Sequence, residues 1–124
     1  MAVSNLLTTL IERLLDLTTE GKIKWEETAD ENVFLASVSH NVVTIGRRRS
    51  PEDYDSWDYE IQVSDRQGRL VDETSSSDTS VTAEGGNPYV DLARLFEAAR
   101  RKALDTDKVL AELISSLDSI GHSK

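Results

Sequence analysis

Apolar residues recur at helical spacing in three stretches of the chain. In the first, leucine and isoleucine doublets repeat every three or four residues, and Gly21 stands where a left-handed residue would end the helix. Pro88 is suited to the first turn of a second helix, and Thr106 or Asp107 can cap a third. This pattern predicts helices over residues 3–20, 88–104 and 107–120.

Between the first two helices, apolar and polar residues alternate with the period of two that a half-buried strand requires. The alternation is clearest over residues 57–64. Turn-forming residues at 39–41 and 65–68 predict tight hairpins, so the strands within residues 22–72 should form an antiparallel meander. Residues 73–86 are rich in serine, threonine and glycine, and we expect a mobile loop or a weak edge strand there.

The order of these elements predicts one α+β domain spanning residues 1–124. An N-terminal helix would precede an antiparallel β-meander of four to five strands, and two C-terminal helices would pack on one face of that sheet. Three helices with wide apolar faces offer more apolar surface than one small sheet can cover. We therefore expect a homodimer, formed through the helices, to bury the surplus.

Composition narrows the classes of function. The chain has no cysteine, which excludes disulfides, thiolate nucleophiles and most structural zinc sites. Glu12, Arg13 and Asp16 interrupt the first apolar stretch, and no basic segment precedes it, so it predicts neither a signal peptide nor a membrane span. The expected location is the cytoplasm, without membrane association.

Negative charge is concentrated in the middle of the chain. The net charge is −9, and residues 51–86 contain 10 acidic and 2 basic side chains. Such a field opposes the binding of nucleic acid or anionic lipid, and it either favours a basic protein partner or serves solubility. The candidate partner surface consists of Glu52, Asp53, Asp55, Asp58 and Glu60.

The same carboxylates raise the question of a metal site, because Ca²⁺ and Mg²⁺ prefer oxygen ligands. A calcium loop starting at Asp53 would need glycine at its sixth position and glutamate at its twelfth. Asp58 and Ser64 occupy those positions. We therefore interpret the acids as part of a solvated loop, and we predict neither a metal nor another cofactor.

Two arginine clusters could form an anion site if the fold brought them together. Arg47, Arg48 and Arg49 form the first cluster, and Arg100 and Arg101 form the second. Paired guanidinium groups bind phosphate well, so a small-anion or nucleotide-binding domain is the alternative function. Local pairing with neighbouring acids, or exposure on the polar side of a helix, would explain the same residues without a ligand.

The sequence contains no recognisable catalytic constellation. His40 and His122 are the two imidazoles, and neither has a serine or aspartate partner that would suggest a hydrolytic triad. Acidic residues around Trp57 and Tyr59 oppose a stacking platform for nucleic acid. The sequence thus predicts a non-enzymatic protein-protein interaction or regulatory module, of which an acidic inhibitor or immunity-type protein is one form.

Three segments carry a resemblance to other proteins. They are Gly-Lys-Ile-Lys-Trp at 21–25, Asp-x-x-Gly at 65–68, and Tyr-x-x-Leu-x-x-Leu-Phe-Glu-x-Ala-Arg-Arg-Lys-Ala-Leu at 89–104. Together they resemble a family of small, uncharacterised bacterial α+β proteins, over most of the chain except residues 73–86. The resemblance implies a bacterial or phage source and a stand-alone domain. No function is known for that family, so none carries over.

Overall fold

The described part of the chain folds into five strands and three helices. The computed structural model describes residues 5–50, 55–76 and 88–122. The helices are α1 (Asn5–Thr19), α2 (Pro88–Ala103) and α3 (Thr106–His122). The strands are β1 (Glu26–Glu27), β2 (Val33–Val38), β3 (Asn41–Arg49), β4 (Trp57–Ser64) and β5 (Leu70–Ser75). The predicted α+β class, with one helix before an antiparallel sheet and two after it, is confirmed.

Helix α1 ends next to the glycine that the sequence indicates. Gly21 has a φ of 76°. Its amide N–H donates to the Thr18 carbonyl at 3.0 Å, and the amide of Lys22 donates to the Leu17 carbonyl at 2.9 Å. These two bonds form a Schellman motif, which satisfies carbonyl groups that the end of a helix would otherwise leave free.

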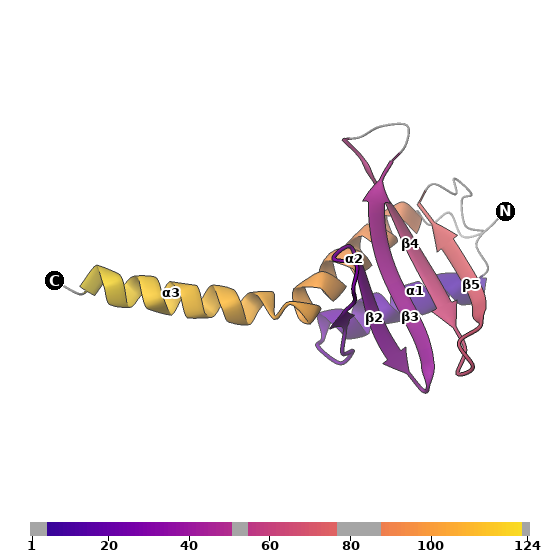
Figure 1. Cartoon of the computed structure of the whole chain (residues 1–124), viewed down its shortest axis with the longest axis horizontal. Helices are drawn as coiled ribbons and strands as arrows, with labels where there is room; N and C mark the ends of the chain where they lie inside the picture. Colours follow the sequence, from indigo (N-terminus) through magenta and orange to yellow (C-terminus); the bar gives the residue numbers. More distant parts are fainter. Residues whose placement is uncertain (1–4, 51–54, 77–87, 123–124) are drawn as a thin grey trace.

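The sheet is an antiparallel meander in the order β1-β2-β3-β4-β5 (Figure 1). Ser39 and His40 form the turn between β2 and β3, with φ values of 51° and 69°. Positive φ at both central residues is the mark of a type I′ hairpin turn. Asn41, which was predicted as a turn residue, begins β3 and pairs with Val38. The predicted turn at 65–68 is confirmed, with Gly68 at a φ of 81°.

At both edges the sheet departs from the predicted strand region of residues 22–72. The segment before Glu26–Glu27 leaves the sheet because Trp25 is buried and its indole N–H donates to the hydroxyl of Thr18 in α1. At the other edge, β5 continues past residue 72, since Thr74 is buried opposite Ile61. The segment 73–86, expected to be a mobile loop or a weak edge strand, thus begins as the end of the edge strand β5, and its residues 77–86 lie outside the described residues.

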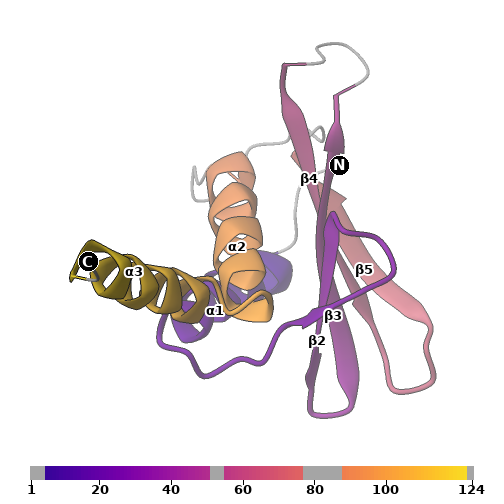
Figure 2. The ribbon, with the colours of Figure 1, turned by 60° about the vertical axis from the view of Figure 1, so that its left-hand side comes forward.

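One face of the sheet carries the core. Helices α1 and α2 lie on the same side of the sheet, with α2 against the strands and α1 packed on α2 (Figure 2). Phe96 of α2 is fully buried, and the ring centroids of Phe34 and Tyr59 each lie 5.6 Å from its own. The other buried apolar residues are Leu7, Ile11, Leu14, Trp25, Ala36, Val43, Ile45, Ile61, Leu92, Leu95 and Ala99. The apolar stripes of the first two helices thus build the core.

Helix α3 follows α2 after a two-residue connection. Asp105, in this connection, has a left-handed φ of 51°, which redirects the chain. Arg101 of α2 pairs with Asp107 of α3 across the junction. From there α3 extends away from the sheet along the long axis of the molecule (Figure 1).

Candidate functional site

The sheet has a second face, which none of the described helices covers (Figure 2). Residues of a strand alternate between the two faces, and Tyr59 and Ile61 of β4 point into the core. Asp58, Glu60 and Gln62 therefore lie on the other side. We call this side the open face.

Cross-strand pairing brings further acidic residues onto the open face. Gln62 stands opposite Glu73 of β5, and the same row crosses β3 and β2 to reach Glu26 of β1. The side-chain amide of Gln62 donates to Glu60 Oε1 at 2.9 Å and to Glu73 Oε2 at 3.1 Å. One glutamine thus holds carboxylates from two neighbouring strands in fixed positions.

The structure places part of the predicted partner surface on this face. Asp58 and Glu60 belong to the open face, where Arg48 is the cross-strand partner of Asp58. Asp55 is exposed just before β4. The two remaining residues of the predicted surface, Glu52 and Asp53, lie outside the described residues.

Strand alternation divides the first arginine cluster between the two faces. Arg48 lies on the open face, whereas Arg47 and Arg49 lie on the side of the core. Their guanidinium carbons are 4.2 Å and 4.1 Å from the centroid of the Trp57 ring, which is cation–π distance. Arg47 also lies 4.8 Å from the ring centroid of Phe96. These contacts give Arg47 and Arg49 a structural role at the edge of the core.

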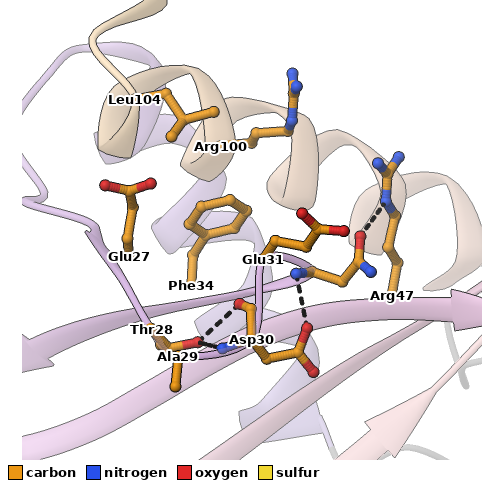
Figure 3. Close-up of a pocket in the computed structure, with 10 residues that line it drawn as sticks. Glu27, Thr28, Ala29, Asp30, Glu31, Phe34, Arg47, Arg100 and Leu104 are labelled. Carbon is orange, nitrogen blue, oxygen red and sulfur yellow. Dashed lines mark hydrogen bonds between the residues drawn. The ribbon is translucent and has the colours of Figure 1, made fainter.

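A pocket of about 440 Å³ brings one arginine of each cluster together (Figure 3). Arg47 lies at one side of this pocket, and Arg100 lies on α2 above Phe34. Arg101 does not line this pocket and pairs with Asp107 instead. The predicted meeting of the two clusters is therefore limited to one residue from each.

The lining of this pocket is mixed in charge. Glu27, Asp30 and Glu31 come from the β1 strand and the loop that follows it. The Arg47 guanidinium is also engaged, because Nε donates to Asn32 Oδ1 at 3.3 Å and Nη1 lies 3.9 Å from Glu97. Three carboxylates against two guanidinium groups do not concentrate the positive charge on which anion recognition depends.

Helix α3 presents an apolar stripe to solvent. Its large apolar side chains are exposed by 46–68%. They are Val109, Leu110, Leu113, Ile114, Leu117 and Ile120. A contiguous row of this size differs from the scattered apolar residues of an ordinary surface and is typical of an interaction site.

Metal sites, membrane-spanning helices and histidine were also sought in the part of the chain that the structure describes. No group of three or more histidine, cysteine, aspartate or glutamate residues within it is arranged to hold a metal ion. No helix within it is both long enough and apolar enough to cross a membrane. His40 is exposed in the turn between β2 and β3.

Comparison with known proteins adds no relative. No protein-family model, curated protein or solved structure matches the chain. The resemblance to a bacterial family stays a prediction, and the function has to be argued from the geometry of the described surfaces.

Proposed function

We propose that this chain is a non-enzymatic protein-interaction module that binds a basic protein through the open face of its sheet. The proposal depends on one observation: Glu26, Asp58, Glu60 and Glu73 share a face that none of the described helices covers. An acidic inhibitor or immunity-type protein, which covers a basic site on its target, is the form of module that this face suits best.

Two properties of the open face support this role. The sheet beneath it is packed on α2, so the carboxylates stand on a rigid surface and little ordering would be needed on binding. The net charge of −9 would also attract a basic partner over a distance of about one Debye length, roughly 8 Å at physiological salt. A homodimer, as expected from the sequence, would carry two such faces.

An affinity pulldown from a bacterial lysate at low and high salt tests the proposal. The bait proteins are the wild type, the open-face variant Asp58→Asn/Glu60→Gln, and the control Glu12→Gln/Asp16→Asn. The control removes the same charge from exposed positions of α1. We expect a basic protein that the wild type and the control retain at low salt, that high salt releases, and that the open-face variant fails to retain. Equal retention by both variants would contradict the proposal, as would salt-insensitive binding.

A second candidate function, binding of a small anion or nucleotide, is favoured by the shared pocket of Arg47 and Arg100. Thermal unfolding with inorganic phosphate and a panel of nucleotides tests it. A ligand for this pocket should raise the melting temperature of the wild type and of Arg101→Gln, but not that of Arg100→Gln. No shift with any member of the panel would exclude this candidate for those ligands.

A further inference from the structure

None of the residues that the structure describes buries the apolar stripe of α3. Residues 107–121 of the helix are all exposed. A 17-residue helix without packing is marginal in water, because most helical stability in proteins comes from burial of an apolar face. A helix of this kind therefore gains both burial and helical order from a partner.

The spacing of the stripe fits another helix. Leu110, Leu113, Leu117 and Ile120 follow one another at intervals of three, four and three residues. This is the spacing of the a and d positions of a coiled coil, in which the side chains of one helix insert between those of a second. Val109 and Ile114 flank the seam and widen it.

The stripe is also symmetric about its own middle. Counted from Ser115, the four seam residues lie at −5, −2, +2 and +5. Two copies of α3 in antiparallel orientation would therefore place Leu110 opposite Ile120, and Leu113 opposite Leu117. A two-fold interface requires a surface that is complementary to itself, and this stripe meets that condition.

The charges of α3 favour the same partner. Lys108, Glu112 and Asp118 lie on the helix away from the seam. Asp107, two turns before Ile114, lies beside the seam at the start of the helix, where it pairs with Arg101. Two copies can thus approach along the stripe without bringing like charges together, although the chain as a whole is strongly acidic. Few charged groups lie next to the stripe, so charge contributes little to the choice of partner there.

We infer that α3 is a dimerisation helix that pairs with α3 of a second copy in antiparallel orientation. The antiparallel arrangement aligns the two helix dipoles favourably. It also separates the two acidic bodies by the length of α3, about 25 Å, whereas a parallel pair would place them side by side. A separation of 25 Å exceeds the Debye length at physiological salt several-fold, so the repulsion between the bodies is screened.

Light scattering coupled to gel filtration, on the purified full chain at micromolar concentrations, tests the pairing. We expect a wild-type mass of twice 13.8 kDa. Leu113→Glu/Leu117→Glu should give the monomer mass, because it places carboxylates in the seam. Ser115→Glu/Ser119→Glu adds the same charge on the outer side of α3 and should remain a dimer. A wild-type monomer, or a dimer that survives the seam substitutions, would overturn the inference.

Loss of the dimer has to be separated from loss of the fold. The seam side chains are exposed and lie outside the core, so the near-ultraviolet circular dichroism of the tryptophans should be the same in all three proteins. Orientation can be tested because the chain has no cysteine of its own. Under oxidising conditions, a mixture of Leu110→Cys and Ile120→Cys proteins should form a disulfide-linked pair, whereas each variant without the other should not. Efficient linkage of either variant to itself would overturn the antiparallel arrangement.

The dimer and the proposed function involve different surfaces, so either one can be overturned without the other. The mass measurement uses purified protein, so it does not depend on a basic partner. A monomeric wild type that still captures a basic protein through the open face would overturn the dimer and leave the proposed function in place. A dimer that captures no basic protein would give the opposite result.

Discussion

At the scale of single residues, one side-chain hydrogen bond fixes the chain between α1 and the sheet. The indole N–H of Trp25 donates to the Thr18 hydroxyl at 2.9 Å, and Thr18 is fully buried. An indole donor buried in an apolar core without an acceptor would lose its hydrogen bond to water and gain nothing in return. Thr18 is therefore a structural residue, although the sequence pattern does not mark it as one.

Thr18→Val should lower the free energy of unfolding by about 1–3 kcal/mol, because it keeps the shape of the side chain and leaves the indole donor unsatisfied. Urea denaturation monitored by tryptophan fluorescence measures the change. Thr19→Val is the matched control, since Thr19 is exposed and bonds to the Leu15 carbonyl of its own helix. The control should stay within about 0.5 kcal/mol of the wild type. Equal losses in both variants would show that the indole bond contributes little.

In the turn between β4 and β5, the carboxylate of Asp65 makes a contribution to folding stability that depends on pH. The backbone N–H of Arg69 lowers the pKa of Asp65 below its usual value of 3.8, and the Gln67 N–H and the Arg69 side chain act in the same direction. A carboxyl group with a lowered pKa in the folded state stabilises that state above its usual pKa. The contribution is lost as the pH falls through the lowered value.

Asp65→Asn should therefore be less stable than the wild type at pH 7, with the difference shrinking as the pH falls below about 4. Urea midpoints at pH 7 and pH 3 test this. Asp72→Asn serves as the control, because Asp72 is an exposed aspartate on β5, outside this turn. A difference between Asp65→Asn and the wild type that stays constant over this range would contradict the assignment.

At this scale the sequence predicts the conformation of a residue where only one residue type fits the position. Gly21 and Gly68 stand in left-handed positions, as their places after a helix and in a turn indicate. Ser39 and His40 are also left-handed, but positive φ is uncommon in residues other than glycine, so the pattern pointed to Asn41 instead. Thr74 is buried because it pairs with Ile61. The sequence around Thr74 does not show which residue of another strand it pairs with, so its burial could not be predicted.

At the scale of elements, alternation along β3 decides what its arginines do. Arg47 is partly buried, and its guanidinium packs on the Trp57 and Phe96 rings. Arg48, one residue further, faces the open side. A planar guanidinium can stack on aromatic rings while its edge donates hydrogen bonds, and an ammonium group cannot do both.

Arg47→Lys should consequently lower the free energy of unfolding by about 1–2 kcal/mol, through loss of stacking and of the Asn32 bond. Arg48→Lys makes the same chemical change on the other face of the strand and should have an effect within about 0.5 kcal/mol. Chemical denaturation of the two variants gives the comparison. If the two arginines proved equally sensitive, stacking on Trp57 would not be the stabilising contact.

The sequence predicts only part of each candidate surface, because the rest depends on how the elements are arranged. The alternation in β4 indicates that Asp58 and Glu60 share a face, and the sequence alone supports that much. The addition of Glu26 and Glu73 depends on the order and register of the strands, which a single sequence does not contain. Likewise, the apolar stripe of α3 is readable from its spacing, but its exposure follows from where α2 ends and how Asp105 turns the chain.

At the scale of the whole molecule, the two proposed surfaces would act together. An antiparallel α3 pair would hold two bodies at opposite ends of one rod, each with its own acidic open face. Two linked binding sites convert the second encounter with a multivalent target into an intramolecular event, which raises the overall avidity without any new contact. The dimer should therefore matter for binding to a surface and not for binding to a single site.

Binding to a poly-lysine-coated surface and to a short lysine-rich peptide in solution separates these cases. Leu113→Glu/Leu117→Glu and Ser115→Glu/Ser119→Glu have the same net charge but are expected to differ in oligomeric state. On the surface, the dimeric Ser115→Glu/Ser119→Glu protein should dissociate at least tenfold more slowly, within the range that bivalency provides. In solution, the two proteins should bind the peptide with equal affinity per chain, because each open face acts independently. Equal dissociation rates from the surface would mean that pairing through α3 does not present two open faces to one target.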